Sequence, residues 1–174
     1  LGLGDRYTER DSAQALDTHL GKVVRVNKEG SVPADNPLVG RAGALPEVYS
    51  WGHRNIQGAA RDGQGRLWMV EHGPQGGDEL NRIEPAVNFG WPVITYGEHY
   101  GGGKIGRGTH RSGMAQPVLQ WTPSIAPSGL AWLGSTRYGK DWQGSLFVGA
   151  LKGQALLRLE MRGERVRAQQ WLLK

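Results

Sequence analysis

The sequence predicts an all-β fold of the β-propeller class, and three observations lead to this prediction. Apolar runs that end in a polar or Gly-rich loop occur three times, at 1–6, 67–73 and 146–153. Each is followed within two dozen residues by an alternating apolar run with an Arg at its third or fourth place. Helical periodicity is weak throughout. Short strands repeated in sets of about four, closed radially to hide their edges, form a propeller.

The individual elements follow from the same patterns. An alternating run predicts a half-buried strand, and a continuous apolar run predicts a buried one. Gly58–Ala60 and Gly129–Ala131 echo each other ahead of the second and third buried runs, and Glu47–Trp51 is also strand-like. Ser12–Leu20 is the best candidate for one short helix or turn. We expect strands near Val23–Val26, Leu67–Val70, Leu80–Ile83, Leu146–Val148 and Leu156–Leu159.

Length and composition set the domain organisation. A chain of 174 residues suits one domain, and its 28 Gly and 9 Pro make it rich in turns. About three blades do not close a ring, and an open half would leave strand edges unpaired. We therefore expect residues 1–174 to form part of a larger propeller, incomplete at both ends. The alternative is a complete small β-sandwich whose internal echoes arise by chance.

Composition also excludes several classes of protein. No apolar run approaches the roughly 18 residues that a membrane-spanning helix needs. The absence of Cys rules out disulfides, thiolate metal sites and Cys nucleophiles. The net charge of +5 comes from Lys and Arg that are scattered singly, without a nucleic-acid-binding signature. A small polyanion bound by a few convergent cations is a better partner for this charge than nucleic acid.

Arg54 and Asn55 are the first candidate binding residues. They follow the strand-like run Glu47–Trp51 and Gly52, which permits a tight turn. The planar guanidinium of Arg54 suits carboxylates or quinone oxygens, and Asn55 adds a directional amide donor. A solvated surface turn is the alternative for this pair.

The segment from Glu71 to Pro74 is a candidate calcium site. It ends a buried strand, where backbone carbonyls released from the sheet can turn toward a hard cation, and calcium takes six to eight such oxygens. Asp78 and Glu79 supply negative charge, and the Phe89 carbonyl lies in a Gly-bounded turn. The spacing is not that of an EF-hand. For His72 a structural hydrogen bond is expected rather than a role as base or ligand.

Lys152 occupies the place in the third repeat that the Glu71 loop occupies in the second. Loops that open at one end of a propeller converge on its axis, so Arg54, Gly73 and Lys152 are expected to face one site. The aromatic side chains of Trp91, Tyr96 and Tyr100 form walls for a flat ligand or a sugar ring, or else pack within their loops.

Four segments together resemble the soluble quinoprotein sugar dehydrogenases of the glucose/sorbosone or aldose sugar dehydrogenase family. They are GHRNIQG at Gly52–Gly58, EHGPQGGDELN at Glu71–Asn81, NFGWP at Asn88–Pro92 and FVGALKG at Phe147–Gly153. A weaker match at the start extends the resemblance over nearly the whole chain. The resemblance implies the C-terminal half of a six-bladed propeller that oxidises the anomeric carbon of aldoses with pyrroloquinoline quinone and calcium.

The resemblance also assigns site residues. Arg54 and Asn55 would contact the quinone oxygens. Tyr100 would line the cofactor site, with Leu151 and Lys152 beside the quinone or its carboxylates. The carbonyls of Gly73 and Pro74 would hold a catalytic calcium, and Glu79 with the Phe89 carbonyl would form a second, structural calcium site. The family usually has Tyr at position 89, a harmless change if only the main chain binds.

Two features of the family lie outside the matching residues. Its catalytic His, the general base, lies upstream of the segment that resembles the start of this chain, so no catalytic residue is assigned here. Its cofactor-clamping Arg pair would come beyond Lys174, and we interpret Arg165 and Arg167 as surface charges. By resemblance the parent is a periplasmic or secreted enzyme with an external electron acceptor. The alternatives are a catalytically silent propeller that binds ligands and a calcium-dependent lactonase.

Overall fold

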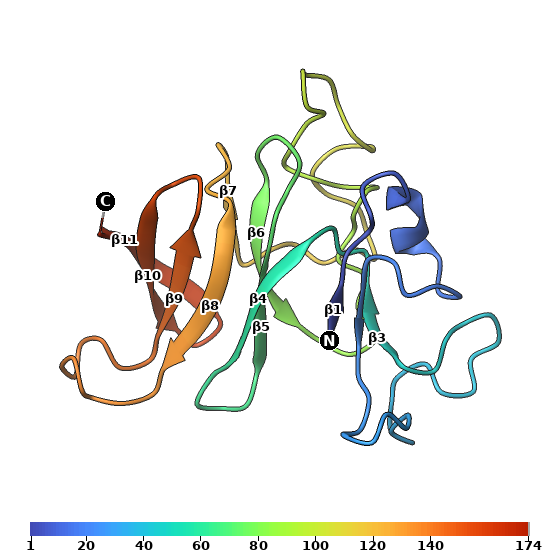
Figure 1. Ribbon diagram of the computed structural model, residues 1–174, viewed down its shortest axis with the longest axis horizontal. Coiled ribbons are helices and arrows are strands. Elements are labelled where there is room, and N and C mark those ends of the chain that lie inside the picture. Colours follow the sequence, from blue (N-terminus) through green and yellow to red (C-terminus); the bar gives the residue numbers. More distant parts are fainter. Residues whose placement is uncertain (174) are drawn as a thin grey trace.

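The computed structural model describes residues 1–173 and contains three antiparallel sheets arranged side by side (Figure 1). The first sheet has three strands and the other two have four each. The all-β, propeller-like architecture predicted from the sequence is confirmed. The strands are β1 (Gly2–Leu3), β2 (Lys22–Val24), β3 (Val48–Trp51), β4 (Ile56–Arg61), β5 (Leu67–Glu71), β6 (Asp78–Ile83), β7 (Leu119–Trp121), β8 (Pro127–Leu133), β9 (Ser145–Ala150), β10 (Ala155–Arg162) and β11 (Arg165–Leu172).

Within each sheet the strands pair antiparallel in simple order. The second sheet runs β4-β5-β6-β7 and the third β8-β9-β10-β11, so both are meanders, although the long segment 84–118 separates β6 from β7. All five strands expected from the repeats are present. The first of them, β2, ends at Val24 rather than at Val26. The Arg25 N–H donates to the Glu47 carbonyl, which lies just outside β3, and Val26 is exposed.

The main hydrophobic core lies between the second and third sheets. Its fully buried members come from the continuous apolar runs of both sheets: Trp68, Val70, Leu80, Leu146, Val148, Leu157 and Leu159. Burying a side chain of this size contributes roughly 1.5–3 kcal/mol. The apolar runs thus hold adjacent sheets together and fix the relative positions of the loops at their ends.

The echo between Gly58 and Gly129 marks a close contact between the inner strands β4 and β8. A Cβ added at Gly58 would lie 2.6 Å from the Leu130 nitrogen and 2.9 Å from the Gly129 Cα. No side chain fits at that distance, so the two strands approach each other backbone to backbone. The repeated glycine is therefore a packing requirement of the fold.

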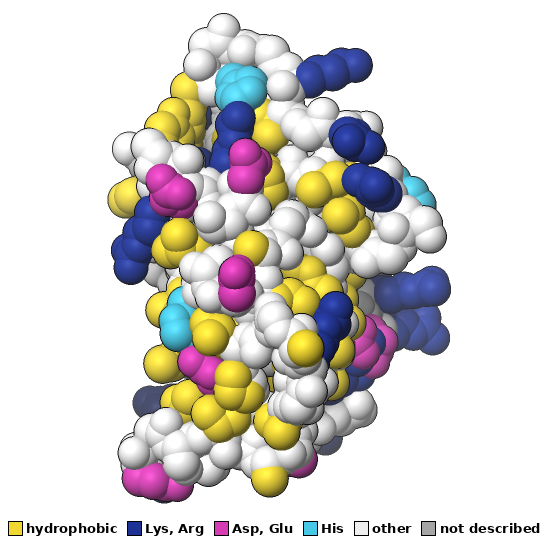
Figure 2. All heavy atoms as spheres, turned by 90° about the vertical axis from the view of Figure 1, so that its right-hand side faces the viewer, with side chains coloured by type: hydrophobic (Ala, Val, Ile, Leu, Met, Phe, Trp, Pro, Cys, Tyr) yellow, Lys and Arg dark blue, Asp and Glu magenta, His cyan; other side chains and the backbone are white. Residues whose placement is uncertain are grey.

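One short 3-10 helix, η1 (Arg10–Gln14), follows the first strand. The sequence places this element at Ser12–Leu20, but the helix begins earlier and ends at Gln14, and the following residues form bends. Among residues 1–173 no helix is long and apolar enough to cross a membrane. Figure 2, which faces the side of the first sheet, shows hydrophobic, basic and acidic side chains interleaved on that side.

Candidate functional site

Three loops lie together at one end of the sheets, which we call the loop end. They join β3 to β4 at Gly52–Asn55, β5 to β6 at His72–Gly77, and contain the turn Asn88–Trp91 after β6. Gly52 has a φ of 74°, and a Cβ there would lie 2.4 Å from the Asn88 Oδ1 atom. The predicted tight turn is therefore present, and the glycine also lets the first and third loops touch.

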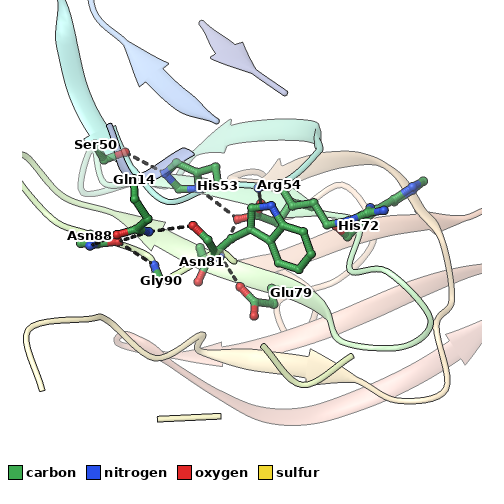
Figure 3. Close-up of polar contacts among 11 residues, drawn as sticks. Gln14, Ser50, His53, Arg54, His72, Glu79, Asn81, Asn88 and Gly90 are labelled. Atoms are coloured by element: carbon green, nitrogen blue, oxygen red, sulfur yellow. Dashed lines mark hydrogen bonds and ion pairs between the residues drawn. The ribbon is translucent and has the colours of Figure 1, made fainter. Parts of the chain in front are cut away.

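A buried polar network joins these loops (Figure 3). The His53 ring is fully buried, with Nε2 2.9 Å from the Ser50 Oγ and Nδ1 3.0 Å from Glu71 Oε1. The other carboxylate oxygen of Glu71 accepts the backbone N–H of Arg54 at 2.7 Å. Glu71, the last residue of β5, thereby fixes the start of the Arg54 loop from the neighbouring sheet strand.

The environment of Glu71 favours its charged form. Burial disfavours ionisation, but electrostatic attraction to the His53 ring and hydrogen bonds from His53, Arg54 and Asn81 outweigh it and lower the pKa of Glu71. A carboxylate that accepts several donors in a buried site is held firmly in one orientation. The loop end thus contains one fixed negative charge surrounded by its own donors.

Glu79 is in a different situation. The only hydrogen bond to its carboxylate among the described residues comes from the Asn81 Nδ2 at 3.0 Å. The same nitrogen also donates to Glu71 at 2.9 Å. Burial, followed by the negative charge of Glu71, raises the pKa of Glu79 to about 8. The Oδ1 of Asn81 is buried and has no hydrogen-bond partner in the part of the chain described. The Asn81 oxygen therefore lacks the partner that a buried polar group normally has, and the half-buried Glu79 carboxylate shares its one donor with Glu71.

Arg54 is 8% exposed and directs its guanidinium to a cavity of about 290 Å³. One guanidinium nitrogen donates to the His72 carbonyl at 3.2 Å, another is 3.5 Å from the Tyr100 hydroxyl, and the group lies 5.5 Å from the centre of the Trp91 ring. Among residues 1–173 no carboxylate forms an ion pair with Arg54. The residues lining this cavity are Tyr7, Thr8, Arg10, Asp11, Arg54, Pro74, Trp91, His99, Tyr100 and Ile105.

The carbonyls predicted as metal ligands belong to loops held by side chains. Asp78 is fully buried and accepts the N–H of Gly73 at 2.9 Å as well as the N–H groups of Ile125 and Ala126 at 2.8 Å each. It therefore organises the loops rather than facing a ligand. Within residues 1–173 no hydrogen bond to the carbonyls of Gly73, Pro74 or Phe89 is found. Those oxygens remain available to a further partner.

The structure brings some of the predicted residues together and not others. Pro74 and Tyr100 share the Arg54 cavity, and a small adjacent space contacts Arg54, Gly73, Glu79 and Phe89. The turn with Leu151 and Lys152 lies at the same end of the sheets (Figure 1). Lys152, however, lines a separate groove with Trp121 and Trp171, and Leu151 is exposed.

The remaining candidates have local partners. The Asn55 side chain accepts a hydrogen bond from Gln57 at 2.8 Å, and the Asn55 carbonyl accepts the His72 N–H at 2.9 Å. The His72 ring lies 2.8 Å from the Pro127 carbonyl, which fits the expected structural role. Trp91 is buried and Tyr96 bonds to Gln116, so of the three aromatic candidates Tyr100 is the exposed one.

Sequence reasoning missed Ser50, His53 and Asn81, and treated Glu71 as part of a calcium shell. The available signal was the position of these residues at strand ends next to Arg54 and Glu79. Polar residues at such positions are expected to point into the same loop cluster.

Known proteins of one family match this chain over nearly its whole length. The family model described as Glucose / Sorbosone dehydrogenase matches residues 1–174. The chain belongs to the glucose/sorbosone dehydrogenase family. It is 41% identical over 169 residues to the aldose sugar dehydrogenase YliI of Escherichia coli, a match that covers 95% of this chain and 45% of that protein.

Solved structures of the family have the same fold. A crystal structure of a glucose dehydrogenase is 46% identical and superposes with a TM-score of 0.96, covering 99% of this chain and 50% of that one. The PQQ-bound aldose sugar dehydrogenase of Streptomyces coelicolor is 35% identical with a TM-score of 0.73, covering 95% of this chain and 42% of the other. The chain therefore spans about half the length of these relatives.

Proposed function

We propose that this chain is the C-terminal half of a quinoprotein that oxidises the anomeric carbon of aldose sugars with pyrroloquinoline quinone and calcium. The observation that carries the proposal is Arg54, a buried guanidinium without a carboxylate partner among the described residues, at the wall of a cavity. A buried charge without a counter-charge is costly. An anionic, electron-rich ligand such as the quinone would supply the missing counter-charge.

The residues around this cavity fit a flat, anionic cofactor. Arg54 offers a planar donor fork, and Tyr100 and Trp91 lie beside it. Asn55 sits next to Arg54 and carries an amide donor. We propose that Arg54, Asn55 and Tyr100 hold the quinone, with Leu151 and Lys152 approaching it from the β9–β10 turn. Lys152 would bind the cofactor only if that ligand extends beyond the Arg54 cavity.

The oxygen atoms at the loop end fit calcium, which prefers carboxylate and carbonyl ligands. We propose that the Gly73 and Pro74 carbonyls hold a catalytic calcium, and that Glu79 with the Phe89 carbonyl holds a second, structural one. The orphaned Oδ1 of Asn81 and the raised pKa of Glu79 support the second site, since a cation would satisfy the first and neutralise the second.

In this proposal the quinone, when bound, accepts a hydride from the sugar. The residues of this chain bind and orient the cofactor, and the general base comes from the other half of the protein. A periplasmic or secreted location and an external electron acceptor accompany the proposal by resemblance. A lactonase would need a carboxylate cluster on the axis, and Arg54 suits an anionic quinone better than a lactone.

The test is acceptor reduction with pyrroloquinoline quinone, calcium, an aldose and an artificial electron acceptor, measured for the complete protein and for residues 1–174 alone. The complete protein should turn over and the 174-residue piece should not. In the complete protein, Arg54→Ala and Lys152→Ala should each weaken cofactor binding, since each removes a cation that faces an anionic ligand. Sustained turnover by the isolated piece would contradict the proposed source of the base and would make His72 the first residue to test.

A further inference from the structure

The polar network at the loop end connects two positions that the proposed function treats separately. Glu79 belongs to the proposed structural calcium site, and Arg54 belongs to the proposed cofactor site. Between them stands Glu71, which shares the Asn81 amide with Glu79 and accepts the Arg54 backbone N–H. The Glu71 carboxylate therefore contacts the Arg54 backbone of one site and the Asn81 side chain beside the other.

We propose that Glu71 is a positioning residue that transmits cation occupancy at Glu79 to the Arg54 loop, an inference that rests on the proposed function. In this role Glu71 touches neither cofactor nor substrate. It acts through the Arg54 backbone and the Asn81 side chain. The cation at Glu79 would thereby strengthen cofactor binding at a distance, in addition to any stability that it confers.

The physical basis is competition for one donor group. The Glu71 and Glu79 carboxylates both accept hydrogen bonds from the Asn81 Nδ2, at 2.9 Å and 3.0 Å. The Glu71 carboxylate disfavours negative charge on the neighbouring Glu79, and a cation bound to Glu79 would offset this repulsion. Glu71 can then keep its remaining donors, the His53 ring and the Arg54 N–H, in fixed geometry.

A second contact leads from the same cation position to the same carboxylate. The Phe89 ring stacks on His53 with a centroid separation of 4.6 Å and an interplanar angle of 27°. Phe89 carries the carbonyl proposed as the other ligand of this calcium, and His53 lies 3.0 Å from Glu71. The two proposed calcium ligands therefore contact two different partners of Glu71: Glu79 contacts Asn81, and Phe89 contacts His53.

The experiment is a double-mutant cycle read on the dissociation constant for pyrroloquinoline quinone, in the complete protein at saturating calcium. Glu79→Gln removes the cation ligand, and Glu71→Gln removes the charge of the connecting carboxylate while keeping its size. With Glu71 present, Glu79→Gln should weaken cofactor binding at least about fivefold, the lower end of ordinary site-to-site coupling. In the Glu71→Gln background the same change should have an effect of less than about twofold.

Two further variants separate positioning from general support of the fold. Asn81→Ala removes the bridge and leaves both carboxylates, so it should also abolish the effect of Glu79→Gln. Asp62→Asn alters a buried carboxylate at the far end of the same sheet, and the effect of Glu79→Gln should persist in that background. Calcium-dependent melting confirms that each variant is folded and reports the cation site independently of activity.

The outcomes distinguish this inference from the proposed function. If the wild-type protein binds no pyrroloquinoline quinone, the proposed function fails and the coupling fails with it. If cofactor and calcium both bind but the effects of Glu79→Gln and Glu71→Gln multiply independently, the proposed function stands and the positioning role of Glu71 is wrong. A Glu79→Gln effect that survives Asn81→Ala would likewise overturn it.

Discussion

Two carboxylates of the second sheet, Asp62 and Glu79, stand in opposite environments. Asp62, in the β4–β5 turn, accepts the N–H groups of Gln64 and Arg66, the Arg66 Nε and the Trp68 indole N–H. Burial opposes its ionisation, but these four donors outweigh it and lower the pKa of Asp62 to about 2. Within residues 1–173 the Glu79 carboxylate accepts from Asn81 alone, and its pKa is raised to about 8.

The difference shows how to separate a structural carboxylate from one that awaits a partner. Asp62 is buried and Glu79 is half-buried, so solvent exposure does not explain why Glu79 has the raised pKa. The number of donors does. A fold that supplies four donors to one acid and a single shared amide to another has satisfied the first acid, and the second fits the proposed cation site.

The largest expected effect is the loss of calcium stabilisation in Glu79→Gln. A cation present at about 100 times its dissociation constant adds about 2.7 kcal/mol, or a melting shift of about 5–10 °C for a chain of this size. The variant should show no such shift because it loses the charged ligand. Melting with calcium and with chelator measures it, and Glu84→Gln, on an exposed ion pair with Arg82, is the matched control. An equal response in Glu79→Gln and wild type would rule out Glu79 as an important ligand.

The next largest effect is expected on the stability of the protein when Asp62 is changed. Asp62→Asn should lower the free energy of unfolding by about 1–3 kcal/mol, since an amide nitrogen would face the Arg66 or Trp68 donors. Urea unfolding measures this change. Asp35→Asn, which alters an exposed pair with Arg25, should cost less than about 0.5 kcal/mol. Equal losses in the two variants would mean that the donors around Asp62 contribute little.

Acid sensitivity sharpens the same comparison. The folded-state pKa of Asp62, about 2, is below its ordinary value of 3.8, so its stabilisation is fully present above pH 3.8. It is lost as the pH falls through 2. The free energy of unfolding should therefore decline more steeply between pH 4 and 2 in wild type than in Asp62→Asn, and the two curves should converge near pH 2. Parallel curves over that range would contradict the assignment.

The smallest effect is expected for Phe89→Tyr. The proposed calcium ligand at this position is the backbone carbonyl, so the added hydroxyl leaves the ligand unchanged. The calcium-dependent melting shift should match that of wild type, even if baseline stability changes because the ring stacks on His53. A clear change in calcium affinity would show that the side chain takes part.

Much of the fold follows from local pattern, and less of the site does. Alternation and apolar runs predict β5, β6, β9 and β10, because the spacing of apolar residues within a strand shows which of its faces are buried. Arg54, Glu79 and Tyr100 can also be named as candidates from the sequence, since their loops have distinctive composition. The network that joins them is not visible in the same way. The pair His53 and Glu71 spans 18 residues of sequence, and the pairing of β4 with β5, which sets Ile56 opposite Glu71, brings it together.

Two lysines also show that local sequence pattern does not predict which side chains meet in the fold. Lys22, in β2, is fully buried and donates to the carbonyls of Ser12, Ala13 and Leu20 at 2.5–3.1 Å, although a lysine is ordinarily expected at the surface. Burial lowers its pKa to about 8. Lys152 is predicted to face the same site as Arg54, but it lines a separate groove with residues of β7 and β11, strands that the repeat pattern does not place.

The bare contact between Gly58 and Gly129 also has a geometric consequence. Here β4 and β8 meet without side chains, so their backbone separation limits how closely the second and third sheets can approach each other. In a closed ring the angles between neighbouring sheets must add up to one full turn. A methyl group placed at this contact would widen the angle between these two sheets. The angles between the other sheets would then have to narrow to compensate. One added carbon atom would thus change the diameter of the channel at the centre of such a ring.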